Sequence, residues 1–166
     1  MIERVWSMPS KWTFTIKPIK ELIDEEMTEG VWVDPFAGEN SPATITNDLN
    51  PVRPTNYHMQ ALEFLKMFDD SSVEGVLFDP PYSPRQVKEC YDSIGIEGWD
   101  GRVNFWSDCK KEVARIVKPN GKVISFGWNS AGIGKSRGFG ITRILIVPHG
   151  GSRNDTICTV DIKEVE

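Results

Sequence analysis

Two short apolar segments of the chain each run directly into an Asp-Pro pair. Residues 31–33 precede Asp34, and residues 74–78 precede Asp79. A short apolar run that stops at such a turn signal indicates a buried strand that enters a loop. Helical patterns lie between these runs, and an alternation of strands and helices builds a mainly parallel sheet covered by helices.

The rest of the chain continues this alternation of strands and helices, but its last two predicted elements are both strands. Apolar spacing predicts helices over residues 16–27, 57–68, 85–93 and 104–117. Further strands are expected over residues 43–47, 122–126, 141–147 and 156–162, with a turn at 118–121 and a glycine-containing loop at 127–140. A short turn joins the last two strands, so they form an antiparallel hairpin. We therefore predict an α/β fold with a Rossmann-like sheet that is mainly parallel and closes on an antiparallel C-terminal hairpin.

Composition narrows the class of protein. The length of 166 residues, with 39% hydrophobic and 26% charged residues, predicts one globular domain over residues 1–166. Cys90, Cys109 and Cys158 lie far apart, and neither histidine has a partner at metal-ligand spacing, so we expect no disulfide framework and no metal. The longest aliphatic run, residues 144–147, is far short of the roughly 20 residues that span a bilayer. We expect a cytoplasmic protein, of a prokaryote or of a virus within its host cell, with no membrane partner.

The net charge of −5 is unevenly distributed along the chain. Residues 1–83 hold 6 basic and 14 acidic side chains, whereas residues 84–166 hold 13 basic and 10 acidic ones. An acidic protein is a poor partner for a phosphate backbone, but the basic second half allows a positive surface there. Solvated charge scattered around the surface is the alternative interpretation.

The tetrapeptide Asp79-Pro80-Pro81-Tyr82 has an unusual chemistry. Two successive prolines remove two N–H donors, so the Asp79 carboxylate and a proline carbonyl present only acceptors to a ligand. A planar exocyclic amine has two N–H donors. Held between two acceptors, its nitrogen lone pair is placed for in-line attack, while Tyr82 can stack on the base. We therefore predict these four residues as the catalytic ones.

The other Asp-Pro exit offers groups that suit a bound cofactor. In an open parallel sheet, ligands bind beyond the carboxyl ends of the strands, near the point where the strand order reverses. Gly38 would let the backbone approach a ligand closely, and the carboxylates of Asp34 and Asp48 could bind an amine or ribose hydroxyls.

These motifs, taken together, resemble those of the class I, S-adenosylmethionine-dependent DNA adenine N6-methyltransferases. The segments that carry the resemblance are WTFTIKPIKELI at 12–23, VWVDPFAGEN at 31–40, TNDLNP at 46–51, HMQALEFL at 58–65, LFDPPY at 77–82 and KVISFG at 122–127. They resemble motifs X, I, II, III and IV and a later sheet motif of the family, in an order similar to its gamma-type members. An in-order set is far more specific than any single motif.

The resemblance implies methyl transfer from S-adenosylmethionine to the N6 amine of adenine in DNA, with S-adenosylhomocysteine as product and no metal. It places the cofactor at Phe14, Thr15, Ile16, Lys17, Asp34, Pro35, Phe36, Ala37, Gly38, Asp48, Leu49, Gln60 and Ala61. Family members carry a helix after motif I and a target-recognition domain after the catalytic core, and neither pattern is present here. Nucleic-acid contact would then fall to Arg85, Lys88, Lys135 and Arg137, with recognition supplied by a homodimer or a partner subunit.

Other functions remain open at this point. RNA is an alternative acceptor, because the tetrapeptide fits an exocyclic base amine without sensing the sugar. A non-catalytic subunit that binds cofactor or nucleic acid is a second alternative, favoured by the short segment after motif I. Residues 129–136 differ by one residue from a phosphate-binding P-loop, but a P-loop needs Gly in place of Asn129 and a helix that opens at Lys135.

Overall fold

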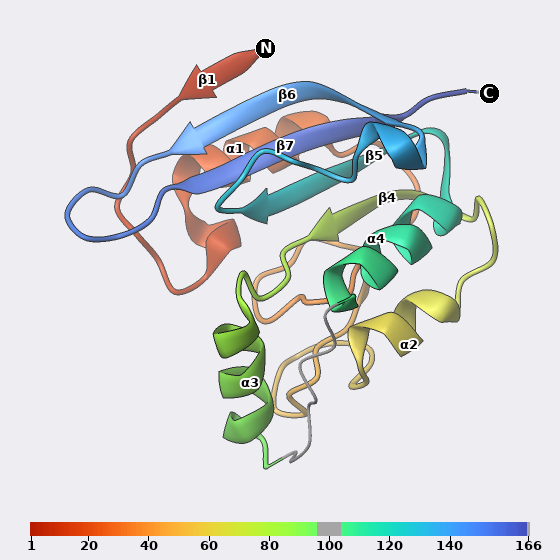
Figure 1. Cartoon of the computed structure of the whole chain (residues 1–166), viewed down its shortest axis with the longest axis horizontal. Helices are drawn as coiled ribbons and strands as arrows, with labels where there is room; N and C mark the ends of the chain where they lie inside the picture. Colours follow the sequence, from red (N-terminus) through yellow and green to blue (C-terminus); the bar gives the residue numbers. More distant parts are fainter. Residues whose placement is uncertain (96–103, 166) are drawn as a thin grey trace.

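A computed structural model describes residues 1–95 and 104–165 as strands and helices around one seven-stranded sheet (Figure 1). The strands are β1 (Ile2–Arg4), β2 (Trp32–Asp34), β3 (Ile45–Thr46), β4 (Val73–Phe78), β5 (Val117–Gly127), β6 (Phe139–Val147) and β7 (Thr156–Lys163). The helices are α1 (Lys17–Glu26), α2 (Ala61–Lys66), α3 (Pro84–Ser93) and α4 (Phe105–Ile116), with short 3-10 turns η1 (Thr13–Thr15) and η2 (Lys135–Arg137). The strand order is β1-β6-β7-β5-β4-β2-β3.

Strand directions confirm the predicted fold class. β7 runs antiparallel to both β5 and β6, and every other pairing in the sheet is parallel. The sheet is therefore mainly parallel, and its antiparallel strands come from the C-terminal part of the chain. The predicted helix over 16–27 corresponds to α1, and those over 85–93 and 104–117 correspond to α3 and α4.

Neighbouring residues of the central strands divide the core between the two faces of the sheet. Trp32 packs on the face covered by α1, whereas Val33 packs on the face covered by α2 and α4. Successive side chains of a strand point to opposite faces, so a strand buried on both sides is apolar throughout. This burial explains the apolar residues at 32–33 and 76–78, which are buried on both faces.

Three elements differ from the sequence expectations. The turn predicted at 118–121 is a bulge inside β5, because Val73 pairs with Val117 while Gly75 pairs with Lys122. The helix expected from residue 57 begins at Ala61, since the backbone of Tyr57 donates to Thr46 and extends the pairing of β3. The first strand, β1, was not predicted.

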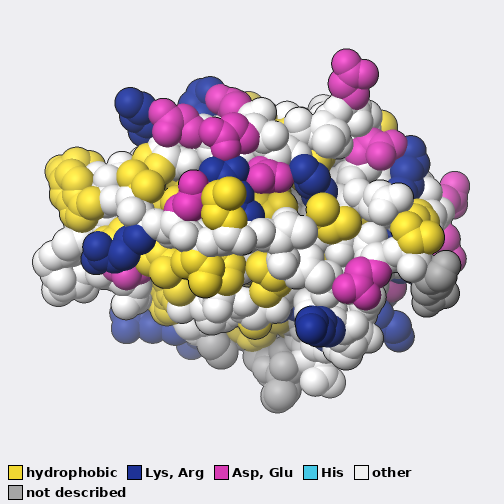
Figure 2. Space-filling view, turned by 90° about the horizontal axis from the view of Figure 1, so that it is seen from above, with side chains coloured by type: hydrophobic (Ala, Val, Ile, Leu, Met, Phe, Trp, Pro, Cys, Tyr) yellow, Lys and Arg dark blue, Asp and Glu magenta, His cyan; other side chains and the backbone are white. Residues whose placement is uncertain are grey.

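Ion pairs attach β1 and α1 to β6. Arg143 on β6 pairs with Glu3 on β1 at 2.7 Å and with Glu25 and Glu26 on α1 at 2.6 and 3.1 Å. Lys122 on β5 also reaches Glu26, at 2.9 Å. Figure 2 shows basic and acidic side chains interspersed on this side of the molecule. An edge strand of three residues is thus held by charge as well as by its backbone pairing.

Asp34 at the end of β2 organises the chain between β2 and β3. Its side chain is fully buried, with one carboxylate oxygen accepting from the Phe36 N–H at 3.0 Å and the other from the Ser41 hydroxyl at 2.6 Å. No helix forms in this connection, all of which the structure describes. Burial raises the pKa of Asp34 to about 7, although both hydrogen bonds lower it.

We expect Asp34→Asn to weaken the pH dependence of stability. The folded protein keeps the Asp34 proton up to about pH 7, whereas the unfolded chain loses it near its ordinary value of 3.8. The folded state binds more protons between these values, so the free energy of unfolding falls as the pH rises from about 4 to 7 and is then level. Urea unfolding of the unaltered protein and of Asp34→Asn at pH 5 and pH 8 measures the free energies of unfolding. An equal fall between the two pH values in both proteins would contradict the prediction.

Gly75 makes room for the ring of Trp32 in the neighbouring strand. A Cβ at this position would lie 2.6 Å from atoms of the buried indole. We expect Gly75→Ala to lower the free energy of unfolding by about 1–3 kcal/mol through overpacking. Gly127→Ala is the matched control in a strand, because its Cβ would meet the Tyr82 ring at an ordinary 3.9 Å. Chemical denaturation of the two variants makes the comparison, and similar losses would show that the indole contact is not the cause.

Candidate active site

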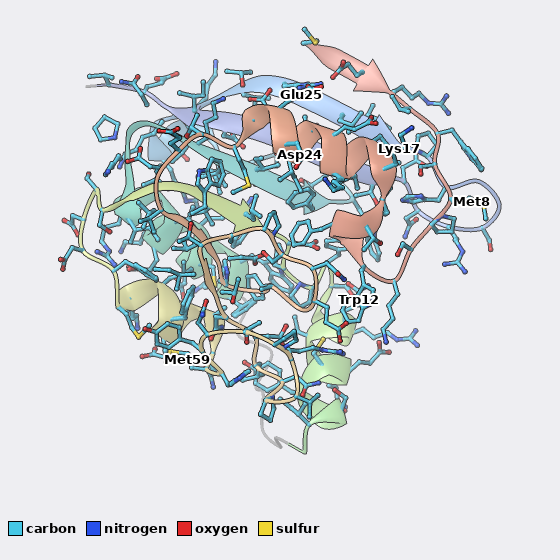
Figure 3. All side chains as sticks on the ribbon, turned by 180° about the vertical axis from the view of Figure 1, so that it is seen from behind. Met8, Trp12, Lys17, Asp24, Glu25 and Met59 are labelled. Carbon is cyan, nitrogen blue, oxygen red and sulfur yellow. The ribbon has the colours of Figure 1, made fainter. Side chains whose placement is uncertain are left out.

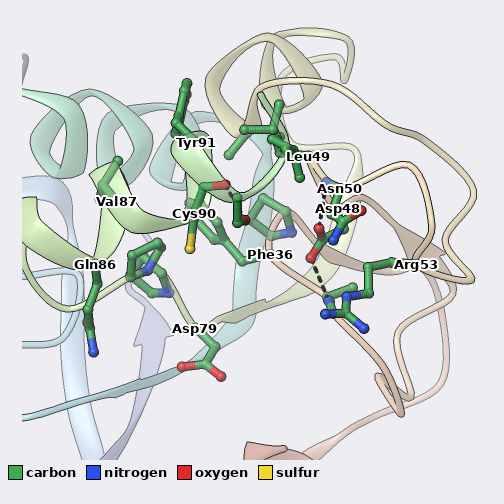
Figure 4. A pocket seen from close by; sticks show the side chains of 18 of the residues that line it. Phe36, Asp48, Leu49, Asn50, Arg53, Asp79, Gln86, Val87, Cys90 and Tyr91 are labelled. Carbon is green, nitrogen blue, oxygen red and sulfur yellow. Dashed lines mark hydrogen bonds between the residues drawn. The ribbon is translucent and has the colours of Figure 1, made fainter. Parts of the chain in front are cut away.

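The strand order reverses between β2 and β4. β3 lies beside β2, and β5 lies beside β4, so the connections leave these two neighbouring strands in opposite directions. Ligands of open α/β sheets bind outside the carboxyl ends of the strands at such a point. A cavity of about 520 Å³ opens there (Figure 4), within the roughly 300–1,000 Å³ typical of small-molecule sites.

Most of the predicted site residues line this cavity. They are Phe14, Pro35, Phe36, Ala37, Gly38, Asp48, Leu49, Gln60, Ala61, Asp79, Pro80, Pro81 and Tyr82. They come from the segment before α1, the connection after β2, the loop after β3, the start of α2 and the exit of β4. The topology therefore brings together residues up to 68 positions apart, from Phe14 to Tyr82.

Four predicted cofactor residues do not line the cavity. Thr15 turns its hydroxyl back to the Trp12 carbonyl at 2.8 Å, and Ile16 is buried in the core beneath α1. Lys17 is exposed on α1 near Glu21. Asp34 is wholly occupied with its own loop, as described above. At these positions the start of α1 and the exit of β2 have a structural role. The motif resemblance alone does not distinguish such a role from ligand contact.

Asp48 lies on the cavity wall and holds two loops together. One carboxylate oxygen accepts from the Gly38 N–H at 2.9 Å, and the other accepts from the Asn50 N–H at 2.8 Å. Each carboxylate oxygen has room for a further donor. Gly38 has a φ of 54°, which favours glycine, and the ring of Trp12 lies beside it. The wall thus presents a carboxylate with spare acceptor capacity.

Asp79 and Tyr82 form a hydrogen-bonded pair at the opposite side of the cavity. The Tyr82 hydroxyl donates to Asp79 Oδ1 at 2.7 Å. Burial raises the pKa of Asp79 to about 6, although hydrogen bonds from Tyr82 and Thr13 lower it. Burial and the Asp79 carboxylate raise the pKa of Tyr82, so its phenol stays protonated and remains a donor.

Hydrogen bonds also fix the backbone of the tetrapeptide. The Tyr82 N–H donates to the Gln86 side chain at 2.6 Å, and the Trp106 indole donates to the Pro81 carbonyl at 2.8 Å. A second cavity of about 350 Å³ lies against this segment and shares Pro80 and Tyr82 with the first. Pro80 and Tyr82 therefore lie between the two cavities, whereas Asp79 and Pro81 line the larger one alone.

The second cavity has aromatic and polar walls. Trp128 approaches Tyr82 with ring centroids 5.2 Å apart, and Trp106 and Lys110 of α4 also line it. The Ser125 hydroxyl in its wall is buried and has no hydrogen-bond partner among the residues that the structure describes. None of these four residues was predicted as part of a site.

The predicted nucleic-acid contacts lie outside both cavities. Arg85 and Lys88 are exposed on α3, where Arg85 pairs with Glu89 at 2.8 Å. Lys135 is exposed in η2, and Arg137 donates to the Ser107 hydroxyl at 2.9 Å. Residues 96–103, which belong to the basic second half of the chain, lie outside the described residues.

Residues that were not among the predicted site residues also line the cavity. Lys11, Trp12 and Thr13 line it from the segment before α1, and Arg53 and Met59 line it from the chain after β3. Trp12 and Met59 are labelled in Figure 3, which shows the molecule from behind the view of Figure 1. Helix α3 adds several side chains, including those of Gln86, Val87 and Cys90. Trp12, Thr13 and Met59 belong to segments that carried the motif resemblance, whereas Lys11 and Arg53 lie outside those segments.

The P-loop interpretation does not agree with the structure. Lys135 and Ser136 belong to the three-residue turn η2, which leads into β6, whereas a P-loop opens a helix at that point. Within residues 1–95 and 104–165, no three His, Cys, Asp or Glu side chains form a group that could hold a metal ion. No helix in those ranges has both the length and the apolar character needed to cross a bilayer.

Comparisons with known proteins identify the fold. No family model and no curated protein matches the sequence. Among solved structures, TrmN from Thermus thermophilus matches 88% of this chain with a TM-score of 0.58 and 16% identity, and the match covers 48% of TrmN, so this chain spans about half of its length. A 1,6-didemethyltoxoflavin-N1-methyltransferase from Burkholderia thailandensis, solved with S-adenosylhomocysteine, has a TM-score of 0.56 and 10% identity over 88% of this chain and 76% of its own. A putative methylase from Haemophilus influenzae has a TM-score of 0.54 and 11% identity over 90% and 96% of the two chains. The chain has the α/β fold of methyltransferases.

Proposed function

We propose that this protein transfers a methyl group from S-adenosylmethionine to the exocyclic N6 amine of adenine in DNA. The observation that carries the proposal is the position of Asp79-Pro80-Pro81-Tyr82 at the strand-order reversal, where all four residues line the larger cavity and Pro80 and Tyr82 also line the smaller one. One cavity can hold the methyl donor and the other the acceptor. The fold shared with methyltransferases supports the coarser part of the proposal, which is methyl transfer.

The residues of the larger cavity fit the proposed cofactor. Asp48 can accept from ribose hydroxyls, as an acidic residue does in nucleotide-binding sheets of this kind. Leu49, Met59 and Ala61 supply apolar surface for an adenine ring. When bound, S-adenosylmethionine supplies an electrophilic methyl group on a sulfonium sulfur. The chain's own contribution is to place the acceptor nitrogen beside it.

The smaller cavity fits a planar base. Tyr82 and Trp128 offer aromatic surfaces, and stacking of a base on aromatic side chains does not depend on its sequence context. The two N–H groups of the amine would donate to the Asp79 carboxylate and the Pro80 carbonyl. The nitrogen lone pair is then directed at the methyl group, and no covalent intermediate with the protein is needed. The acceptor must be unpaired or flipped out of its helix to enter.

DNA is the favoured acceptor, and two alternatives remain. Arg85, Lys88, Lys135 and Arg137 give positive charge on α3 and η2 that can contact phosphates. The same features would serve an RNA adenine methyltransferase. A non-catalytic subunit that binds cofactor and nucleic acid is favoured only by the irregular connection between β2 and β3.

A methylation assay tests the proposal directly. The protein is incubated with labelled S-adenosylmethionine and unmethylated DNA or RNA, and the digested nucleosides are identified. We expect N6-methyladenine in DNA, and a loss of about 100-fold or more in rate for Asp79→Ala, because a preorganised acceptor of the amine is removed. Asp155→Ala removes an exposed carboxylate and is the control. Product in RNA alone would overturn the DNA assignment, and cofactor binding without product would favour the non-catalytic subunit.

The pH dependence of the rate tests the role assigned to Asp79. The ionised carboxylate is the stronger acceptor and presents no O–H donor to the amine, so the rate should rise as the pH passes through about 6 and then level. Tyr82→Phe removes a hydrogen bond that lowers the pKa of Asp79. We expect its acidic limb to move to higher pH, in addition to any loss of rate. The profile is measured as kcat against pH with saturating cofactor and DNA, and an unmoved limb would show that Asp79 does not set the profile.

A further inference from the structure

Charge is arranged asymmetrically around the larger cavity. Its acidic lining residues are Glu39, Asp48, Asp79 and Glu89. Lys11 and Arg53 are the cationic residues that line it within the described part of the chain, and both sit on the ring of Trp12. The Lys11 ammonium lies 5.0 Å from the ring centroid, and the Arg53 guanidinium carbon lies 4.7 Å from it. A ligand carboxylate in this cavity is therefore attracted to the two cations at Trp12, of which Arg53 is paired with Glu39.

The loop after β2 has few donors left for such a carboxylate. The Phe36 N–H donates to the Asp34 side chain, the Ala37 N–H to the Asn47 carbonyl and the Gly38 N–H to the Asp48 side chain. No helix begins in this connection, so it offers no helix N-terminus. A carboxylate that approaches this end of the cavity must be bound by side chains from other segments.

Arg53 is already held in place for this role. Its guanidinium stacks on Trp12, and Nη1 donates to Glu39 Oε1 at 2.7 Å. Figure 4 shows Arg53 beside Asp48 and on the opposite side of the cavity from Asp79. A guanidinium has five N–H donors, so one bond to Glu39 leaves several for a ligand. Stacking reduces the conformational freedom that the side chain would lose on binding.

We infer that Arg53, stacked on Trp12, binds the carboxylate of the amino-acid end of S-adenosylmethionine. The inference rests on the proposed function, and it assigns one end of the cofactor to a residue outside the motifs. Glu39 is the complementary partner for the ammonium group, because a zwitterion presents both charges and the Glu39–Arg53 pair matches both. This contact replaces the donors that the loop after β2 has committed to its own structure.

Truncated ligands separate this role from a structural one. Binding of S-adenosylhomocysteine and of 5′-methylthioadenosine, which lacks the amino-acid end, is measured by calorimetry on the whole chain. We expect Arg53→Gln to weaken S-adenosylhomocysteine binding by about 10- to 100-fold, as for a lost charged hydrogen bond. Binding of 5′-methylthioadenosine should change less than twofold. Arg53→Lys should recover part of the loss, and the exposed Arg153→Gln should bind both ligands as the unaltered protein does.

Each other outcome has a distinct meaning. Equal weakening of both ligands by Arg53→Gln would show a general disturbance of the cavity and overturn the inference. Unchanged binding of S-adenosylhomocysteine would overturn it as well, while leaving the proposed function intact. If the unaltered protein binds neither ligand, the proposed function itself fails. Decarboxylated S-adenosylhomocysteine should be insensitive to Arg53→Gln and sensitive to Glu39→Gln, and the reverse would contradict the assignment of the two charges.

Discussion

Three side chains form hydrogen bonds with backbone groups of the connection between β2 and β3. The rest of the site depends on these hydrogen bonds. Asp34 caps the exit of β2, and Asp48 binds the Gly38 N–H. Asn47, which is fully buried, donates to the carbonyls of Pro35 and Met59 and accepts from the Met59 N–H. A connection without regular structure would otherwise leave buried polar groups unpaired, at a cost of about 1–3 kcal/mol each. These three side chains thus satisfy backbone groups of the connection, as the hydrogen bonds of a helix do in other sheets of this type.

This arrangement has a direct chemical consequence. Backbone N–H groups that already donate within the connection cannot also donate to a ligand. A charged group of the ligand at this end of the cavity would therefore have to be bound by side chains of other segments. Arg53 and Trp12 come from segments 41 residues apart, and they meet only because β3 lies at the sheet edge beside β2. The same arrangement leaves the Asp48 carboxylate facing the cavity with acceptor capacity to spare.

The predicted catalytic residues all line the larger cavity, whereas four of the predicted cofactor residues do not. Buried parallel strands and an Asp-Pro-Pro segment are local features, so most of the strands and the tetrapeptide could be predicted from the sequence, together with 13 of the 28 described residues that line the larger cavity. Thr15, Ile16 and Lys17, which were predicted to bind the cofactor, do not line it, because the side chains at this helix start turn back onto their own turn, toward the core or into solvent. Arg53 and Trp128 could not be predicted, since each depends on a contact with a residue distant in sequence.

The acidic character of the first half of the chain acquires a role within the proposed function. Among the described residues, the cavity that would hold the methyl donor is lined by Glu39, Asp48 and Asp79 of this half and by Glu89 of the second half, and its two cations both contact Trp12. The sulfonium of S-adenosylmethionine is positively charged, whereas the thioether of S-adenosylhomocysteine is neutral. Carboxylates near the sulfur favour the charged form, and this preference is larger in a cavity than in water. Transfer of the methyl group removes the charge that those carboxylates attract, so the same electrostatics that bind the donor also weaken the hold on the product.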